Sequence, residues 1–250
     1  MATAPKPPAK ERQAFSPILL LPNMLTVTAI CAGLTAIRAG VHGNYELAVQ
    51  LIIVAGILDG LDGRLARALG SASKIGAELD SLADFVNFGV ATPLTLYFWG
   101  LQDYRGIGWI AVLVFSICCV FRLARFNVGS KTGGGLGGAY FEGVPSPAGA
   151  LVVMLPLYVS FAFADGPVVP PWLISLQLIV VGLLMISSLP TWSFKTTRIQ
   201  RGNVKYFLVA VAAVGAALAT YAWQMLILLS LAYIGMVLWA LITRSRRSRR

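Results

Sequence analysis

Residues 59–84 read DGLDGRLARALGSASKIGAELDSLAD, and they determine how the rest of the chain is interpreted. This stretch holds five of the ten carboxylates in the 250-residue chain, although apolar segments flank it on both sides. Asp59 and Asp62 share one helix face at a spacing of three residues, and Asp80 and Asp84 share another at a spacing of four. Because a short connection joins the two segments, we expect antiparallel neighbouring helices that bring both carboxylate pairs together.

Four clustered carboxylates predict a site for a divalent cation, because their charges would otherwise repel one another. Hard oxygen ligands favour magnesium, manganese or calcium, and magnesium typically joins a phosphate-bearing substrate. Gly63 and Gly76 leave room for a ligand to approach the backbone. Arg67 lies one turn after Gly63, where it can contact a phosphate oxygen. The alternative is ordinary ion pairing with Arg64, Arg67 and Lys74. The regular spacing of four aspartates at helix ends favours the metal site.

The composition identifies an integral membrane protein. Hydrophobic residues make up 57% of the chain and charged residues only 12%, with a mean hydropathy of +0.76. Soluble domains carry about a quarter charged residues, so a soluble globule and a disordered chain are both excluded. The three cysteines lie in apolar runs without metal-ligand spacing, which argues against a disulfide framework or a zinc site. We therefore predict an all-α polytopic membrane protein.

Apolar segments of roughly 20 residues predict about eight transmembrane helices. These segments lie near residues 18–39, 45–66, 79–101, 107–128, 146–164, 172–189, 204–222 and 224–243. An N-terminal tail over residues 1–17 precedes them, and a basic tail over residues 244–250 follows them.

The basic residues predict the orientation. Eighteen of the 20 lie in alternate connections and in the two tails, and only Arg38 and Arg105 lie on the other side. The positive-inside rule then puts both termini and the aspartates on the cytoplasmic side. The net charge of +10 accompanies high hydropathy, which favours anionic lipid headgroups or phosphate substrates and argues against nucleic acid as a partner.

The same stretch resembles the signature of the CDP-alcohol phosphotransferase family, Asp-x-x-Asp-Gly-x-x-Ala-Arg, eight residues, then Gly-x-x-x-Asp-x-x-x-Asp. The positions that fill it are Asp59, Asp62, Gly63, Ala66, Arg67, Gly76, Asp80 and Asp84. Further family-like stretches are PNMLTVTAICAG at 22–33, RLARFNV at 122–128, FEGVPSPAGA at 141–150 and SSLPTWSFK at 187–195. The resemblance implies a six-helix core over residues 18–189 and a two-helix extension over residues 190–243.

Within the family, the chain resembles the bacterial integral-membrane branch that transfers the phosphatidyl group of CDP-diacylglycerol to the hydroxyl of L-serine, giving phosphatidylserine and CMP. This likeness implies two divalent cations, Mg²⁺ or Mn²⁺, on Asp59, Asp62, Asp80 and Asp84, with Asp84 as a ligand or as the base for the serine hydroxyl. The nucleotide site that it implies consists of Asn23, Thr26, Asp62, Gly63, Arg67 and Gly76. A homodimer in the inner membrane, in contact with membrane lipids, is also implied.

Four further residues are candidate contacts for the substrates. Arg122 and Arg125 end the fourth span, where they would bind the serine carboxylate or a lipid phosphate, or else anchor the helix at the interface. Lys131 begins a glycine-rich loop that is expected to cover the site. Glu142 would contact the serine ammonium group or remain a solvated loop acid.

Two other functions remain open. The signature does not distinguish acceptors, so choline, glycerol 3-phosphate or inositol phosphate could replace serine. Intramembrane acids also occur in ion-coupled transporters. The position of the acids at helix ends and the lack of a convincing internal repeat argue against a transporter.

Overall fold

The computed structural model describes residues 17–71, 73–132, 140–163, 169–187, 190–192, 215, 217 and 220–247. Most of these residues are helical, so the predicted helical class is confirmed. The elements are η1 (Pro17–Leu20), α1 (Leu21–Val41), α2 (Tyr45–Ala68), α3 (Lys74–Asp84), η2 (Phe85–Ala91), α4 (Thr92–Gly100), η3 (Gln102–Tyr104), α5 (Arg105–Thr132), β1 (Tyr140–Glu142), α6 (Ser146–Val153), α7 (Leu155–Phe163), α8 (Pro171–Ile186), β2 (Pro190–Trp192) and α10 (Ala222–Arg247).

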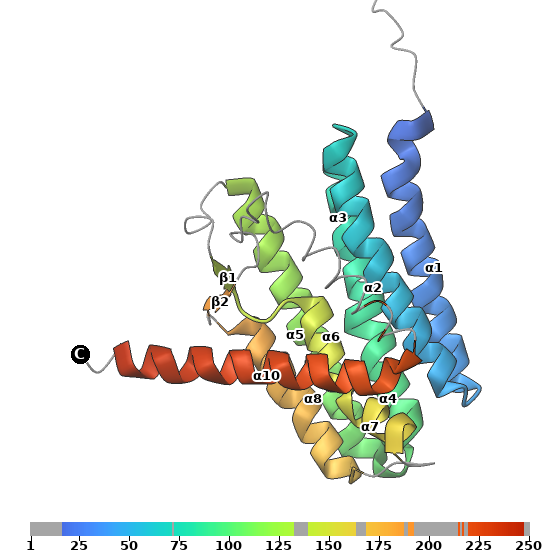
Figure 1. Ribbon diagram of the computed structural model, residues 1–250, viewed down its shortest axis with the longest axis vertical. Coiled ribbons are helices and arrows are strands. Elements are labelled where there is room, and N and C mark those ends of the chain that lie inside the picture. Colours follow the sequence, from blue (N-terminus) through green and yellow to red (C-terminus); the bar gives the residue numbers. More distant parts are fainter. Residues whose placement is uncertain are drawn as a thin grey trace, which may run out of the picture.

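Helices α1 and α2 form a tightly packed antiparallel hairpin (Figure 1). Gly43 supplies the turn with a φ of 77°, a left-handed conformation that glycine adopts without strain. The side chain of Asn44 then caps α2 by accepting a hydrogen bond from the backbone N–H of Leu47 at 3.2 Å. Alanines that are fully buried on the two helices are Ala29, Ala36, Ala48 and Ala55. Small side chains of this kind let membrane helices approach closely.

Helix α3 carries the second aspartate pair, and a π-helical segment begins directly after Asp84. Ser73 caps α3 by accepting a hydrogen bond from the backbone N–H of Gly76 at 2.9 Å. The helical path then continues from α3 through the π-helix η2 into α4. Ser116 of α5 donates a hydrogen bond to the carbonyl of Gly89 within η2 at 2.7 Å. A π-helical turn leaves such a carbonyl available, and these turns are frequent at functional sites.

One feature departs from the all-helical prediction. β1 and β2 form an antiparallel pair, with Tyr140 opposite Trp192. Gly143 follows β1 with a φ of 81°, and a Cβ there would clash with the carbonyl oxygen of Met185. The strands are only three residues long, so no alternating apolar pattern identifies them in the sequence.

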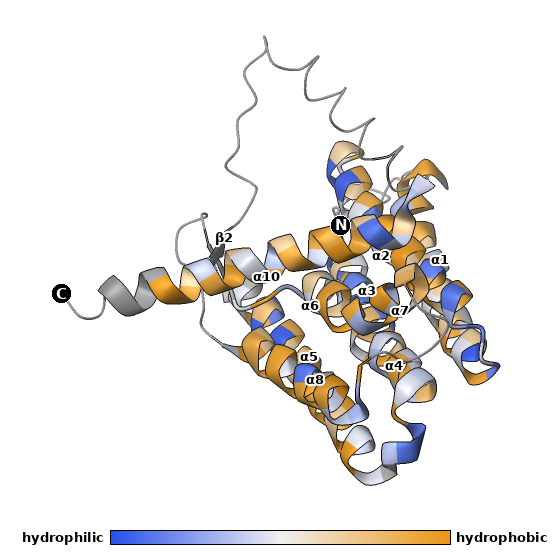
Figure 2. Ribbon diagram, turned by 60° about the horizontal axis from the view of Figure 1, so that its bottom comes forward, coloured by the Kyte–Doolittle hydropathy of each residue, from blue (hydrophilic) through white to orange (hydrophobic). Residues whose placement is uncertain are grey.

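Helix α10 crosses the other helices instead of running alongside α1 (Figure 1). It packs on α6 and α7, where Trp223 contacts Phe161 with ring centroids 4.8 Å apart. Apolar residues dominate both α8 and α10 (Figure 2). The last predicted span therefore exists as a helix, and its direction was not predictable from its composition.

By length and composition, three helical segments within the described residues could cross a membrane: Ile18–Val41, Gly106–Gly129 and Ala222–Ile242. The pair α6 and α7, bent by 40°, raises the number to four if it is one span. Large apolar side chains remain exposed on the outside of the bundle, among them Leu34, Phe121 and Leu183. These findings support a membrane protein.

The predicted number of eight spans is not confirmed. Helix α2 carries too many charged residues to count as an apolar span, and the run from α3 to α4 also carries charged residues of the site. Helix α8 is too short, with only 16 residues. Most of the predicted span 204–222 lies outside the described residues.

Candidate active site

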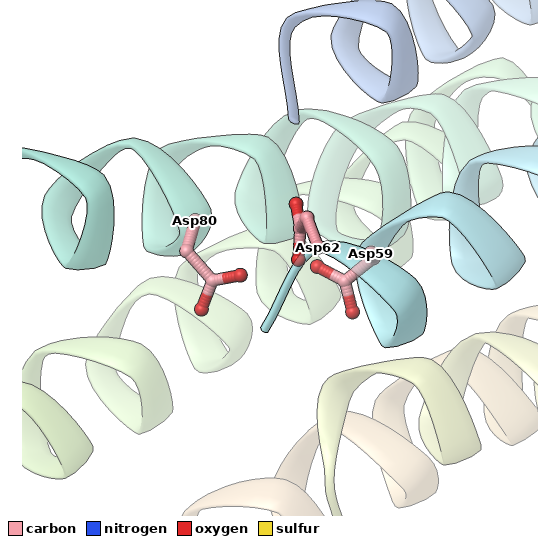
Figure 3. Close-up of side chains that lie close together, drawn as sticks. All are labelled: Asp59, Asp62 and Asp80. Carbon is pink, nitrogen blue, oxygen red and sulfur yellow. The ribbon is translucent and has the colours of Figure 1, made fainter. Parts of the chain in front are cut away.

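Three aspartates from two helices meet in one cluster, as their spacing predicted. Asp59 and Asp62 lie on α2 and Asp80 lies on α3, and each offers a carboxylate oxygen within 4.8 Å of the others (Figure 3). The antiparallel packing of α2 and α3 brings the pairs together across the short connection that contains Gly70, whose φ is 62°.

The donor set fits a divalent cation. Oδ1 of Asp59 and Oδ1 of Asp62 are both buried and have no hydrogen-bond partner among the described residues. Asp62 is only 3% exposed. Buried carboxylates without a counter-charge are costly, and oxygen ligands suit Mg²⁺ or Mn²⁺. The cluster could therefore hold a metal ion.

Helix α1, which carries the predicted nucleotide contacts Asn23 and Thr26, also lies beside the aspartates. The hydroxyl of Thr26 donates a hydrogen bond to Oδ2 of Asp62 at 2.5 Å, and Thr26 is buried. One turn earlier, Asn23 lies against Gly76, since a Cβ added to that glycine would be 3.1 Å from Oδ1 of Asn23. The N-terminal half of α1 therefore supports the carboxylates from α2 and borders the start of α3.

One of the predicted nucleotide-contacting residues, Gly63, faces open space on the helix that carries Asp59 and Asp62. A Cβ added to Gly63 would meet no atom within 4 Å, and the same holds for Gly60. Arg67 is close enough to Asp80 for their charges to interact. This side of α2 thus offers both room and a positive charge next to the aspartates.

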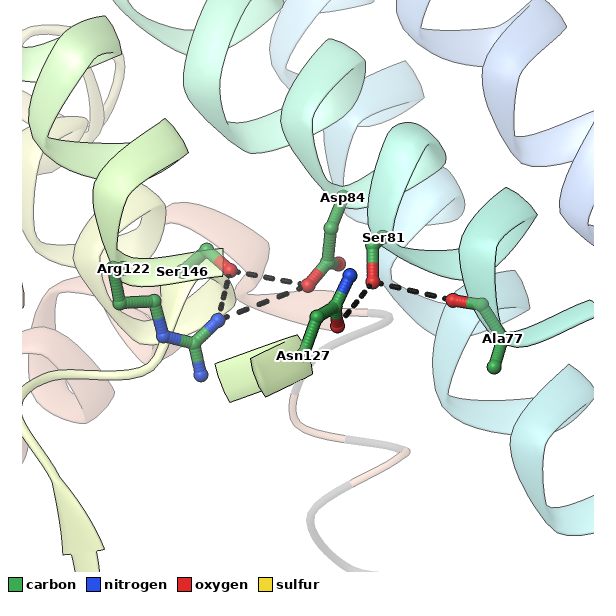
Figure 4. A network of polar contacts seen from close by, with 6 residues as sticks. All are labelled: Ala77, Ser81, Asp84, Arg122, Asn127 and Ser146. Carbon is green, nitrogen blue, oxygen red and sulfur yellow. Dashed lines mark hydrogen bonds and ion pairs between the residues drawn. The ribbon is translucent and has the colours of Figure 1, made fainter. Parts of the chain in front are cut away.

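Asp84 lies at the edge of the cluster, outside the group of three, and joins it to α5 and α6 (Figure 4). Its Oδ2 accepts a hydrogen bond from Oγ of Ser146 at 3.1 Å and lies 3.9 Å from Nη1 of Arg122. Nη1 of Arg122 also donates a hydrogen bond to Oγ of Ser146 at 2.6 Å. The negative charge of Asp84 acts on Asp59, so the four aspartates form one electrostatic unit.

Sequence reasoning missed Ser146, which is fully buried at the first position of α6. The signal that pointed to it was the family-like stretch 141–150, in which Ser146 is the hydroxyl residue between two prolines.

A second polar link near the site was also missed. Ser81 of α3 donates a hydrogen bond to Oδ1 of Asn127 on α5 at 3.0 Å (Figure 4).

The remaining candidate residues occupy different positions. Nη1 and Nη2 of Arg125 donate hydrogen bonds to the carbonyls of Ile186 and Ser187, at 2.9 and 3.3 Å, at the end of α8. Arg125 thus satisfies carbonyls that a helix end leaves without partners. Lys131 is in the last turn of α5 and Glu142 is in β1, but their side chains are outside the described part of the structure.

The chain matches one family model and several curated relatives. The family model described as CDP-alcohol phosphatidyltransferase matches residues 19–189. The CDP-diacylglycerol–serine O-phosphatidyltransferase of Mycobacterium leprae is 37% identical over 227 residues, which cover 90% of this chain and 75% of that protein. The Helicobacter pylori protein of the same name (strain 26695) is 34% identical over 199 residues, which cover 79% of this chain and 81% of that protein.

Two crystal structures of Mycobacterium tuberculosis phosphatidylinositol phosphate synthase are also similar, each at 20% identity. The structure with CDP-DAG bound has a TM-score of 0.49 and covers 73% of this chain and 91% of that one. The structure in complex with manganese and citrate has a TM-score of 0.47 and covers 73% of this chain and 87% of that one.

The family match spans more than half of the chain and includes the whole aspartate stretch. The two relatives exceed 30% identity over most of their own length as well as most of this chain. The chain therefore belongs to the CDP-alcohol phosphatidyltransferase family.

Proposed function

We propose that the protein transfers the phosphatidyl group of CDP-diacylglycerol to the hydroxyl of L-serine, forming phosphatidylserine and CMP. The observation that carries this proposal is the aspartate cluster of α2 and α3 in a chain whose relatives at 34–40% identity bear the name of that serine-dependent activity. A diphosphate substrate needs its charge neutralised, and this cluster has the ligands for that task.

The metal ligands in this proposal are Asp59, Asp62 and Asp80, with Asp84 completing a site for two divalent cations, Mg²⁺ or Mn²⁺. Such cations would neutralise the diphosphate and lower the barrier to displacement of CMP. Thr26 holds the Asp62 carboxylate in position through its 2.5 Å hydrogen bond. Support for these roles comes from the buried carboxylate oxygens that lack protein partners among the described residues.

The cytidine nucleotide would bind on the open side of α2. Gly63 leaves space next to the carboxylates, and Arg67 supplies a positive charge for a phosphate oxygen. Asn23 and Gly76 border the same region from α1 and α3. This arrangement would let CDP-diacylglycerol keep its acyl chains in the bilayer while its headgroup reaches the aspartates.

Asp84 is the proposed base. The serine oxygen attacks the phosphatidyl phosphorus, the bond from that phosphorus to the CMP oxygen breaks, and Asp84 takes the proton of the hydroxyl. An alcohol is a weak nucleophile, so a carboxylate beside the reacting phosphorus accelerates this step. The contacts of Asp84 with Ser146 and Arg122 hold the carboxylate in a fixed direction.

We also propose eight transmembrane spans, cytoplasmic termini and a cytoplasmic site in the inner membrane, where the protein forms a homodimer among membrane lipids. The start of α1, the connection from α2 to α3 and the end of α5 lie at one end of the bundle (Figure 1). Basic residues concentrate in these segments and in the tails, which supports a cytoplasmic location for that end.

The test is release of CMP from CDP-diacylglycerol by the full-length protein purified in detergent. We expect release that requires Mg²⁺ or Mn²⁺ and L-serine, and that stops when the metal is chelated. Choline, glycerol 3-phosphate and inositol phosphate serve as competing acceptors. Release with one of these but not with serine would keep the family chemistry and reject the acceptor. No release with any alcohol, from folded protein, would reject the reaction and favour a transporter.

A further inference from the structure

The described part of the chain beyond residue 189, where the family match ends, includes a helix that returns to the active site. Ser230 of α10 donates a hydrogen bond to the carbonyl of Leu151 on α6 at 3.2 Å. Trp223 packs on Phe161 of α7, and Leu226 and Val237 of α10 are buried. These contacts set the rotation of α10 about its axis relative to α6, the helix that begins with Ser146.

Tyr233 lies about one turn beyond Ser230, near the polar network that contains Asp84 and Arg122. Its hydroxyl is buried and has no hydrogen-bond partner among the described residues. Its side chain is close enough to Arg122 for the two groups to interact electrostatically. A buried hydroxyl without a partner is uncommon in folded proteins, and one near the arginine that pairs with Asp84 points to a ligand as the missing partner.

Arg122 is suited to bind an anion at this position. Its guanidinium lies over the ring of Phe126, with 5.8 Å from Cζ to the ring centroid, and its side chain is only 10% exposed. Nη1 contacts Ser146 and Asp84, whereas the other nitrogens have no hydrogen-bond partner within the described residues. An arginine has five N–H donors, so Arg122 can pair with Asp84 and still donate hydrogen bonds to a second carboxylate.

We propose that Tyr233 is a specificity residue: its hydroxyl donates a hydrogen bond to the carboxylate of the acceptor, which Arg122 binds at the same time. The hydroxyl of the acceptor then points toward Asp84, which lies on the other side of Ser146. This inference rests on the proposed serine-dependent function. It explains how the site would distinguish an amino-acid alcohol from choline or ethanolamine, which have no carboxylate for Arg122 and Tyr233.

The test compares Tyr233→Phe with Tyr158→Phe in the full-length protein. Tyr158 of α7 is a matched control, because its hydroxyl is also buried without a partner in the described structure. CMP release is measured while L-serine is varied at saturating CDP-diacylglycerol and metal. For Tyr233→Phe we expect KM for serine to rise roughly ten- to a hundredfold, the effect of losing a hydrogen bond to a charged group. KM for CDP-diacylglycerol and all constants of Tyr158→Phe should stay unchanged.

Two further readouts separate acceptor binding from a structural role. L-serine should raise the Tm of the wild-type protein, and Tyr233→Phe should need proportionally more serine for the same rise. Serinamide, which lacks the carboxylate, should inhibit both proteins equally. An unchanged KM for serine in Tyr233→Phe, or an equal rise of both KM values, would overturn the inference. Failure of the wild-type protein to release CMP with serine would instead reject the proposed function.

Discussion

Nη1 of Arg122 lies 3.9 Å from Oδ2 of Asp84, and this ion pair joins α5 to α3 at the edge of the aspartate cluster. Ser146 bridges the two side chains, with hydrogen bonds of 2.6 Å from Arg122 and 3.1 Å to Asp84. Asp84 therefore differs from the other three aspartates, because within the described residues it alone forms an ion pair with an arginine. Its remaining oxygen, Oδ1, is buried without a partner in the described structure.

Asp84→Asn should lower kcat at least about a hundredfold, because an amide cannot take the proton of the acceptor hydroxyl. The metal concentration for half-maximal binding is measured as well, and we expect a larger rise if Asp84 is also a ligand than if it acts on the metal through its charge alone. Glu78→Gln is the control, as Glu78 is an exposed acid on the same helix. A kcat within threefold of wild type for Asp84→Asn would contradict the assignment as base.

Thr26→Val should weaken metal activation, because it removes the hydrogen bond that orients Asp62. Partners of metal ligands typically change metal affinity tenfold or more, so we expect about ten times more Mn²⁺ for half-maximal activity. Thr28→Val tests the specificity of the effect, because Thr28 is exposed and donates its hydrogen bond to the carbonyl of Met24 in its own helix. If both variants needed the same Mn²⁺ concentration for half-maximal activity, Thr26 would not support the cluster.

Gly89→Ala should destabilise the protein by about 1–3 kcal/mol, as overpacking does elsewhere. The new Cβ would lie 2.7 Å from the ring of Phe85 and 3.0 Å from Sγ of Cys119. Gly235→Ala is the matched change in open space, with no atom within 4 Å, and should be neutral or slightly stabilising. Tm in detergent measures both. A higher Tm for Gly89→Ala would mean that η2 can shift away from α5.

Arg125→Met should lower Tm by several degrees without changing KM for either substrate, because Arg125 bonds two carbonyls at the end of α8. The lost hydrogen bonds to a charged group are worth about 1–3 kcal/mol. Arg64→Met controls for removal of an exposed positive charge near the site. A raised KM for serine or CDP-diacylglycerol with unchanged Tm would restore Arg125 as a substrate-binding residue.

Local sequence patterns were sufficient for the aspartate cluster. A helix brings residues three or four positions apart onto one face, so the pairs Asp59–Asp62 and Asp80–Asp84 could be read directly from their spacing. The short connection between α2 and α3 then required the two helices to pack against each other. The prediction that α1 reaches the same site came from the family resemblance, and the contacts of Thr26 and Asn23 agree with it.

Other features were not predictable because they depend on contacts between distant segments. Ser146 is 62 residues from Asp84, and β1 pairs with a strand that begins 50 residues later in the numbering. The π-helical turn η2 has no local signal, and the role of Arg125 depends on where α8 ends. Apolar composition identified α10 as a helix but contained no information about the direction in which it crosses the bundle.

The sequence by itself determined the helical membrane class, the positions of most helices and the two carboxylate pairs, because hydropathy and helical periodicity are local properties of the chain. Only the tertiary structure decided which groups meet around those carboxylates: Thr26 on Asp62, Ser146 and Arg122 on Asp84, and Tyr233 beside Arg122. These contacts follow from how the helices pack, and packing depends on the shapes of all the interlocking side chains together.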